Sequence, residues 1–525
     1  KAYVDSVFTL ERLDTQVAGM TPVQIGQIRL YGKIIQKAIL EILETGSLRE
    51  LEELTAQTPP GIFDIMQVKG LGIKKVKALW RDLGIDSLES LKEACEKGTI
   101  AQLKGFGVKT QDAILESIAF LESLKGKVRL DEALALGGQI RGELQKIYPE
   151  TYLSGEALRR ENIVSELAFI VVKEGFGGIK LPGDIFYQDV RGSSPGTWRG
   201  HYLNFDIPVI IEKSSARDLV SKSIIKSAAE AHLVRQNENG ETFLSFLGKG
   251  SFDSEEQAYG QFGLPYIIPE MRNGREEFER AVAPESIITR EKIRGTVHNH
   301  STYSDGKHTL TEMARACMDL GWEYFGIADH SQTAAYARGM WPETVRKQHT
   351  EIDGLNAGFN GEFRILKGVE SDILPDGSLD YDTEVLKTFD YIVASVHSVL
   401  SMDMEKATSR LIRAIENPYT SILGHPTGRL LLRRAGYPID HRKVIDACAA
   451  NGVIMELNAN PYRLDIDWTW ISCCLEKGVM ISINPDAHST AGLLDMKYGV
   501  MIARKAGLPS EMTLNALPPD EVMKS

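Results

Sequence analysis

In TVHNHSTYSDG, residues 296–306, a short apolar run ends in two histidines and then an aspartate. Later segments share this plan: an apolar, β-favouring run reaches a histidine or carboxylate and then a loop. They are FGIADHS at 325–331, LKGVESDIL at 366–374, VASVHS at 393–398, ILGHPTG at 422–428 and INPDAHS at 483–489. Metal-ligand types at the ends of successive strands are typical of a β/α barrel with one site on one face.

Six of the chain's 11 histidines lie in these segments. One such histidine alone is ordinarily a core or surface residue, but this clustering predicts a metal centre. Side chains alternate along a strand, so His298 and His300 face the same side and can hold one ion together; Asp486 and His488 repeat that spacing. Imidazole and carboxylate suit zinc, manganese or iron. The candidate ligands are His298, His300, Asp305, His330, Glu370, His397, His425, Asp486 and His488.

Residues from about 290 to 525 alternate between strand and helix patterns. Strands are expected near 294–298, 323–328, 364–369, 390–396, 420–424, 452–457 and 478–484. Helical periodicity fills the gaps between them, for example at 309–320, 404–416 and 439–451. Seven strand–helix units with ligand-type residues at the carboxyl ends of the strands predict a barrel whose site lies on one face.

Residues 1 to about 130 have the apolar spacing of helices and contain an internal repeat. MQVKGLGIKKVKALW at 66–80 and AQLKGFGVKTQDAIL at 101–115 each place two glycines and a lysine before a helix. A glycine turn that opens a helix points backbone N–H groups outward, where they can hold a phosphate oxygen. The alternative is a pair of helix-connecting turns. The candidate DNA-contacting residues are Gly70, Gly72, Lys74, Gly105, Gly107 and Lys109; a further copy around residues 30–33 lacks its first glycine.

Composition limits the remaining functions. The net charge of −12 argues against indiscriminate nucleic-acid binding, and bound divalent cations would offset part of it. The five cysteines form no CxxC pair, which predicts a reducing, cytoplasmic setting. No apolar run is long enough to span a membrane, and no signal-peptide pattern is found. Lys1 is not an initiator methionine, which leaves the true start open.

The motifs HNHSTYSDG, ADHS, GVESDIL, SVHS, GHPTGRLL and INPDAHS resemble those of the polymerase-and-histidinol-phosphatase (PHP) domain over 290–525. The resemblance implies a distorted seven-stranded barrel with a trinuclear centre. In the family's arrangement, His298, His300, Glu370 and Asp486 would hold the first ion. Glu370 would bridge to a second ion, which His397 and His425 also hold. Asp305, His330 and His488 would hold the third.

Such a centre implies hydrolysis of a phosphoester. A metal-activated water would be the nucleophile, and no separate general base would be needed. Arg429 and Arg463 are candidate phosphate clamps. A role as a surface or loop-bracing arginine is an equal alternative for each.

The order of regions resembles the bacterial family X DNA polymerases: a helix-hairpin-helix region (1–130), an α+β nucleotidyltransferase-like palm and thumb (131–285) and the PHP domain (290–525). Supporting stretches include PPGIFDIMQVKGLG at 59–72 and EEQAYGQFGLPYIIPEMR at 255–272. The polymerase site departs from the family's pattern. In SGEALRRENIVSELAFIVV at 154–172, the paired aspartates are replaced by Glu166 and Ala168, and Asp206 is a candidate third carboxylate. We therefore expect polymerase activity to be lost.

The leading hypothesis is a metal-dependent phosphoesterase of DNA repair, a 3′→5′ exonuclease or a 3′-end or abasic-site processing enzyme. Its partner would be gapped or 3′-ended DNA, bound without sequence preference. An active family X polymerase with an exonuclease is one alternative. A small-molecule phosphatase is a second, and a non-catalytic DNA-binding repair module is a third.

Overall fold

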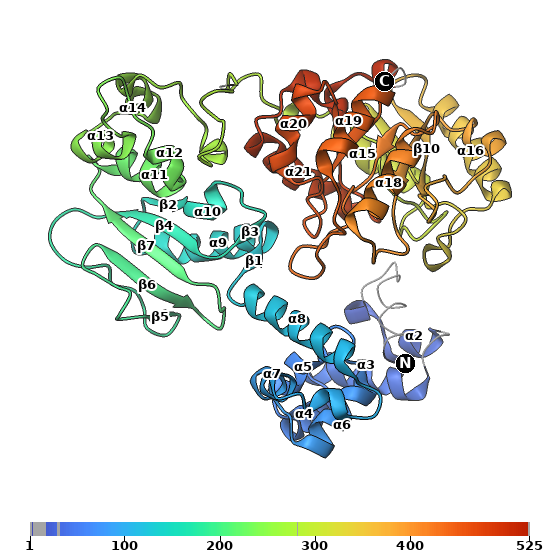
Figure 1. Ribbon diagram of the computed structural model, residues 1–525, viewed down its shortest axis with the longest axis horizontal. Coiled ribbons are helices and arrows are strands. Elements are labelled where there is room, and N and C mark those ends of the chain that lie inside the picture. Colours follow the sequence, from blue (N-terminus) through green and yellow to red (C-terminus); the bar gives the residue numbers. More distant parts are fainter. Residues whose placement is uncertain (1–2, 4–16, 29–31, 281, 523–525) are drawn as a thin grey trace. The chain divides into compact units, whose positions relative to one another are not determined.

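The computed structural model describes residues 3, 17–28, 32–280 and 282–522 of the chain. The chain divides between Lys125 and Gly126 into two compact units, which are described separately below (Figure 1). The third glycine copy expected around residues 30–33 lies partly outside the described residues.

The first unit is helical, as its periodicity predicts. Its core holds apolar side chains from successive short helices, among them Ile65, Leu79, Leu91 and Ile118. The elements are η1 (Val17–Gly19), α2 (Pro22–Gln27), α3 (Lys33–Thr45), α4 (Arg49–Gln57), α5 (Gly61–Met66), α6 (Ile73–Leu83), α7 (Leu88–Glu96), η2 (Ile100–Gln102) and α8 (Val108–Leu124).

The second unit begins with a region built on a mixed five-stranded sheet of order β2-β4-β7-β6-β5, in which β4 and β7 run parallel. The elements are β1 (Val128–Arg129), α9 (Leu130–Gln145), β2 (Thr151–Ser154), α10 (Gly155–Leu158), β3 (Ile163–Val164), β4 (Leu167–Val172), β5 (Phe186–Gln188), β6 (Thr197–Tyr202), β7 (Val209–Ser214), α11 (Leu219–Ser227), α12 (Glu230–Leu233), α13 (Phe243–Lys249), α14 (Glu255–Phe262) and η3 (Pro269–Met271).

The rest of the second unit is a seven-stranded parallel sheet of order β14-β13-β12-β11-β10-β9-β8. Beyond the last strands, His300 N donates to Ala487 O at 2.9 Å, which nearly closes the barrel. The elements are η4 (Arg290–Lys292), β8 (Gly295–Thr296), α15 (Leu310–Asp319), β9 (Tyr324–Ile327), η5 (Ala335–Ala337), α16 (Pro342–Gly358), β10 (Arg364–Asp372), α17 (Thr383–Leu386), β11 (Tyr391–Ser395), α18 (Met404–Ile415), β12 (Ile422–Leu423), α19 (His441–Asn451), β13 (Ile454–Asn458), η6 (Trp468–Trp470), α20 (Ile471–Glu476), β14 (Ile481–Asn484), η7 (Ala491–Asp495), α21 (Met496–Lys505), η8 (Ser510–Met512), η9 (Leu514–Ala516) and α22 (Pro519–Val522).

Apolar residues on both faces of the barrel strands explain why these strands are continuous hydrophobic runs. Val393 of β11 packs with residues of neighbouring strands in one buried cluster, whereas Ile392 and Ala394 pack in another cluster with residues of the surrounding helices. Tyr391 lies so close to β10 that a Cβ atom on Gly368 would come 2.2 Å from its ring. Glycine is therefore required there for the barrel to close around the tyrosine.

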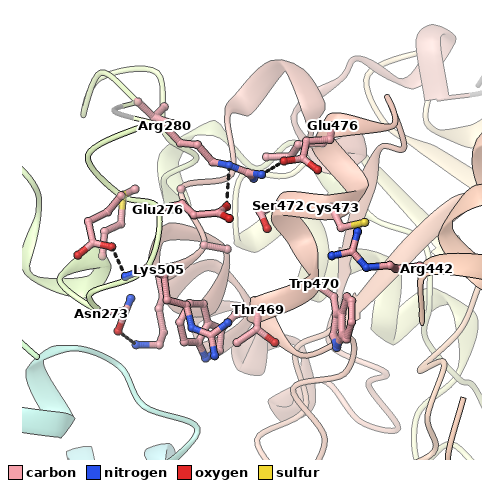
Figure 2. Close-up of a pocket in the computed structure, with 18 residues that line it drawn as sticks. Asn273, Glu276, Arg280, Arg442, Thr469, Trp470, Ser472, Cys473, Glu476 and Lys505 are labelled. Carbon is pink, nitrogen blue, oxygen red and sulfur yellow. Dashed lines mark hydrogen bonds and ion pairs between the residues drawn. The ribbon is translucent and has the colours of Figure 1, made fainter. Parts of the chain in front are cut away.

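The nucleotidyltransferase-like region and the barrel meet at a polar seam around Lys505 of α21 (Figure 2). Its buried ammonium donates to Arg159 O at 3.0 Å, Glu161 Oε1 at 3.0 Å and Asn273 Oδ1 at 2.6 Å. A cleft of about 770 Å³ lies beside this seam, lined by Trp468 and other residues of both regions. The seam fixes the barrel against the preceding region within the second unit.

Among the described residues, no helix has the length and apolar character needed to cross a membrane. All five cysteines are buried and free.

Candidate metal centre

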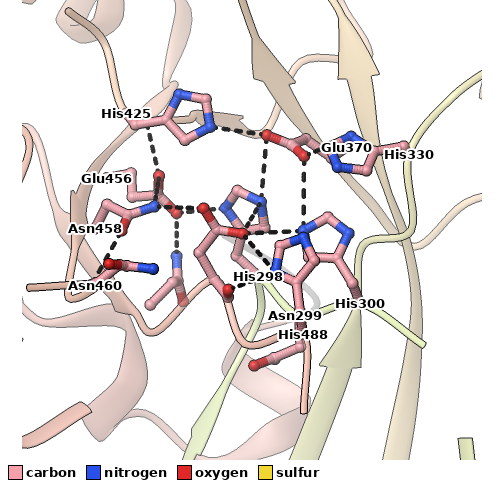
Figure 3. A network of polar contacts seen from close by, with 12 residues as sticks. His298, Asn299, His300, His330, Glu370, His425, Glu456, Asn458, Asn460 and His488 are labelled. Atoms are coloured by element: carbon pink, nitrogen blue, oxygen red, sulfur yellow. Dashed lines mark hydrogen bonds and ion pairs between the residues drawn. The ribbon is translucent and has the colours of Figure 1, made fainter. Parts of the chain in front are cut away.

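All nine predicted ligands lie at one end of the barrel, where the parallel strands end or enter their loops. Figure 3 shows part of this cluster, including His298, His300, His330, Glu370, His425 and His488. Glu370 belongs to β10. His330 follows the neighbouring strand β9, and its backbone pairs with that of Glu370 in an isolated parallel bridge. Asp486 follows β14 with a left-handed backbone, φ 52°, and so turns its carboxylate into the site. Because the parallel strands all end at the same edge of the sheet, residues as far apart in sequence as His300 and Asp486 lie side by side.

Glu370 is the centre of the cluster, with its carboxylate almost fully buried. Its Oε1 lies 2.9 Å from His425 Nε2, 3.1 Å from His397 Nε2 and 3.3 Å from His298 Nε2. Its Oε2 lies 3.0 Å from His330 Nδ1 and 3.6 Å from His300 Nε2. One carboxylate that faces five imidazoles has the geometry of a bridging ligand.

The remaining ligands gather on the His300 side of Glu370. His300 Nε2 lies 3.0 Å from Asp486 Oδ1, and His488 Nε2 lies 3.3 Å from Asp305 Oδ1. The potential ligand atoms form four groups, and within each group they lie within 4.8 Å of one another. The groups are His300, Asp305, His330 and His488; His298, His300 and Asp486; His298, Glu370 and His425; and His330, Asp372 and His397. These overlapping groups include all nine predicted ligands and add Asp372.

The donor set fits divalent cations. The Nδ1 atom of His298 is hydrogen-bonded to Glu456 Oε1 at 2.6 Å, so in the neutral ring Nε2 carries the lone pair. That buried Nε2 has no hydrogen-bond partner, and it faces carboxylate oxygens of Glu370 and Asp486. A lone pair aimed at two carboxylates is unfavourable, so this nitrogen takes either a proton or a bound cation between itself and the carboxylates.

Three carboxylates that the sequence reading missed support the ligands. Glu456 of β13 bonds His298 and also accepts the backbone N–H of His425 at 2.6 Å. Asp372 Oδ1 holds His397 Nδ1 at 2.6 Å, and buried Asp329 accepts from Ser301 and Ser304. Asp372 and Asp329 lie inside the quoted motifs, within two residues of a candidate ligand, and this closeness in sequence could have identified them. Glu456 lies within a strand and had no such signal.

The carboxylates and imidazoles shift one another's pKa values. Burial lowers the pKa of His298, but Glu456 and Glu370 outweigh burial and hold that pKa well above its usual value. Burial raises the pKa of Glu370, but His397 and the other imidazoles reverse the effect and hold it well below its usual value. Burial dominates at His300, whose pKa falls to about 3. The carboxylates of the site are thus ionised, as metal ligation requires, and a bound cation would replace the proton that they hold on His298.

The two candidate arginines occupy different positions. Arg429 donates to Arg463 O at 2.9 Å, to Asp467 Oδ2 at 2.7 Å and to Leu464 O, so its guanidinium braces the loop after β13. Arg463 belongs to that loop, and its Nε lies 3.5 Å from Asp486 Oδ2 at the metal centre. Of the two, Arg463 is therefore the one whose guanidinium lies beside a candidate ligand.

The structure does not gather the three residues of the presumed polymerase site into a ligand group. Ala168 is a buried residue of β4, Glu166 immediately precedes that strand, and Asp206 is exposed before β7. Burial, together with the nearby Glu156, raises the pKa of Glu166. Every group of three or more potential ligand atoms within 4.8 Å, in the part of the chain that the structure describes, lies in the barrel.

In the first unit, both glycine repeats form the expected turns before helices. Gly72 precedes α6 and Gly107 precedes α8. Gly70, Gly105 and Gly107 have positive φ angles of 87°, 89° and 104°, whereas Gly72 is extended. Lys74 and Lys109 are exposed in the first turns of the two helices.

Comparisons with known proteins agree with this geometry. The PHP domain model matches residues 296–460, and the SAM-like helix-hairpin-helix tandem model matches residues 62–119. A probable phosphatase from Thermoanaerobacter sp. is 30% identical over 42% of this chain and 88% of its own length. A solved histidinol phosphate phosphatase from Lactococcus lactis covers 41% of this chain and 94% of its own at 17% identity, with a TM-score of 0.33, too weak to add to the argument.

The fold, the ligand cluster and the PHP match define a metal-dependent phosphoesterase. The DNA polymerase/3′-5′ exonuclease PolX of Bacillus subtilis is 35% identical over 92% of this chain and 88% of its own length. The chain therefore belongs to the PolX family of bacterial family X DNA polymerases.

Proposed function

We propose that this protein is a 3′→5′ exonuclease that trims or repairs 3′ ends, including damaged or abasic ends, during DNA repair. The observation that carries the proposal is the convergence of nine candidate ligand side chains, Glu370 among them, at one barrel end, in a chain that also has a helix-hairpin-helix tandem. The similarity to PolX, whose name includes a 3′-5′ exonuclease, supports this substrate class.

Three divalent cations, zinc, manganese or iron, would fit the nine ligands. Bound cations polarise a phosphoester and lower the pKa of water. His298, His300, Glu370 and Asp486 would hold one cation; Glu370, His397 and His425 a second; and Asp305, His330 and His488 the third. His300 also lies within the third group, and Asp372 lies beside His397, so the set is better supported than its partition. Arg463 would hold a non-bridging phosphate oxygen.

The helix-hairpin-helix unit would hold the DNA backbone. The turns at Gly70–Gly72 and Gly105–Gly107 open α6 and α8, so their N–H groups and the exposed Lys74 and Lys109 can meet phosphates. Contacts of this kind carry no sequence information. We expect affinity to fall steeply with salt, and Lys74→Ala with Lys109→Ala to flatten that dependence.

Templated polymerisation would be absent, because two magnesium ions need carboxylates that this palm does not gather. The β4–β7 register pairs Leu167 with Val209, so Pro208 and Ile210 flank the face that holds Glu166 and Ala168. The carboxylate of Glu156 is bound to Ser165, whose backbone N–H it accepts at 2.6 Å. The carboxylate of β7 that shares this face is Glu212, which lies opposite Ile170, two positions beyond the place of Ala168, and is paired with Lys226 at 2.9 Å.

One gel tests both parts of the proposal. The protein would be incubated with 5′-labelled gapped DNA, Mn²⁺ and all four nucleotides, beside His300→Ala and Glu166→Gln variants. We expect shortened products that vanish with His300→Ala and persist with Glu166→Gln. Lengthened products that vanish with Glu166→Gln would show a working polymerase site and overturn the second part.

Hydrolysis of a small phosphomonoester is the second candidate, favoured by the similarity of the barrel alone to probable phosphatases. The discriminating assay is p-nitrophenyl phosphate hydrolysis with competing oligonucleotide. Inhibition by DNA supports the exonuclease, whereas hydrolysis indifferent to DNA supports the small-molecule reading.

A further inference from the structure

We propose that Tyr336 is the stacking platform for the base of the 3′-terminal nucleotide, an inference that rests on the proposed exonuclease. Its ring lies 5.8 Å from the His330 ring and 6.2 Å from the His397 ring, centroid to centroid. A phosphate held at the metal centre would therefore bring its own nucleotide beside this tyrosine.

Tyr336 is free to meet a ligand. It is 67% exposed, and its interplanar angles of 63° and 64° to the two imidazoles place it edge-on or tilted to them rather than stacked. The described residues offer its hydroxyl no hydrogen-bond partner, and the ring belongs to none of the packed apolar clusters. An exposed aromatic ring in contact with two metal ligands is not needed to hold the fold.

The loop that carries Tyr336 is fixed to the metal centre at several points. Met340 N donates to His330 O at 2.8 Å, and Ser331 N donates to Glu370 O at 3.0 Å. Thr333 Oγ1 donates to Asp372 Oδ2 at 3.2 Å, and Asp372 in turn holds His397. The position of the ring is therefore set by the residues that would place the phosphate.

The Tyr336 ring is exposed to solvent although the loop that carries it is packed against the protein. Ala334 and Ala337, which flank Tyr336 in and beside η5, are fully buried. A Cβ atom on Gly339 would lie 1.8 Å from Ser331 O, so the chain must close tightly on itself there. From this anchored turn the Tyr336 ring extends into solvent beside His330 and His397.

Stacking suits an enzyme that must accept any terminal base. Every base has an aromatic face, and base–aromatic stacking does not depend on hydrogen-bond patterns. It is worth roughly a 5- to 100-fold change in binding per base on alanine substitution. Tyr336 would thus favour nucleotides over base-free phosphoesters without favouring one sequence.

The test compares two single-stranded oligonucleotides that end in thymidine or in a tetrahydrofuran abasic residue. We expect wild type to show a roughly 5- to 100-fold lower KM for removal of the thymidine. Tyr336→Leu should lose that preference, Tyr336→Phe should keep it, and Trp341→Leu, at another exposed aromatic of the same loop, should also keep it. Metal content should be unchanged in all variants.

Equal losses on both oligonucleotides, or a preference that survives Tyr336→Leu, would overturn the stacking role. A 3′-terminal 2-aminopurine gives a readout without turnover, since stacking quenches its fluorescence. Quenching by wild type that is lost in Tyr336→Leu supports the contact even if no DNA is cleaved. Cleavage with no quenching or base preference would reject the inference and leave the exonuclease intact.

Discussion

Glu456 is the residue outside the nine ligands on which we expect metal affinity to depend most. Its carboxylate fixes the His298 ring through Nδ1 and the His425 backbone through its N–H, both at 2.6 Å. Removing such a supporting carboxylate commonly costs 10- to 100-fold in metal affinity or activity. Glu456→Gln should therefore weaken Mn²⁺ binding by about that factor, as measured by calorimetric titration of metal-free protein.

The matched control is Glu405→Gln on the exposed face of α18, which should leave Mn²⁺ affinity unchanged. Circular dichroism would confirm that both variants keep their secondary structure. Wild-type Mn²⁺ affinity in Glu456→Gln would mean that backbone placement alone orients His298.

Arg463 and Arg429 offer a second comparison, because they lie in one network but face different partners. Arg463 is 3.5 Å from Asp486, whereas Arg429 bonds two backbone carbonyls and Asp467. We expect Arg463→Gln to lower kcat by about 10²-fold, the effect of removing one donor to a developing oxyanion. Arg429→Gln should lower the thermal midpoint instead, since hydrogen bonds from a charged donor contribute about 1.5–3 kcal/mol each.

Steady-state kinetics and a thermal melt of both variants separate these roles. The assignment fails if Arg463→Gln loses stability without losing kcat.

The sequence predicted which candidate ligands come together in one site, but it did not predict which carboxylates support them, and the reason is physical. A ligand must stand where a strand ends and a loop begins, and that position leaves a pattern in the sequence. Glu456 stands inside a buried strand, where its role depends on which neighbour the barrel closure brings beside it. Arg429 and Arg463 were indistinguishable in the sequence because hydrogen bonds to backbone carbonyls leave no residue pattern.

At the scale of elements, the glycines that precede α6 and α8 differ in the backbone conformation they adopt. Gly105 has φ 89°, a conformation costly for other residues, whereas Gly72 is extended at φ −75°. We expect Gly105→Ala to destabilise the turn before α8 by about 1–2 kcal/mol and to weaken DNA binding. Gly72→Ala should cause neither loss, because alanine accepts this backbone conformation, and a substitution of this kind stabilises the fold by about 0.4–1 kcal/mol.

Hydrogen exchange of α8 in the full chain would measure the first effect, and fluorescence anisotropy with duplex DNA the second. Open space surrounds both glycines, so steric contact does not confuse the comparison. Equal losses from the two substitutions would mean that something other than backbone conformation makes the glycines necessary.

The barrel strands and major helices were predictable because buried parallel strands appear as apolar runs between helical patterns. The expected strand near 390–396 is β11, and the expected helix at 404–416 is α18. Other strands are shorter than their apolar runs: β8 and β12 each have two residues. Hydrophobic patterning marks burial, whereas strand length follows from how many hydrogen bonds the curved barrel allows.

For the whole molecule, Lys505 makes the seam between the barrel and the preceding region sensitive to pH. Burial lowers its pKa to about 8, although Glu161 opposes the shift. In an unfolded chain the amine would titrate near 10.4. Between these values the unfolded state binds more protons, so this group's contribution to stability rises as pH increases from about 8 to 10.

The measurement is the difference in thermal midpoint between wild type and Lys505→Met across that pH range. Methionine cannot be protonated, so wild type should gain stability relative to Lys505→Met as pH rises, whatever the offset at pH 7. Lys497→Met, at an exposed lysine of the same helix, should show a constant difference. A constant difference for Lys505→Met as well would mean that three acceptors keep the buried amine charged throughout, and that the seam does not respond to pH.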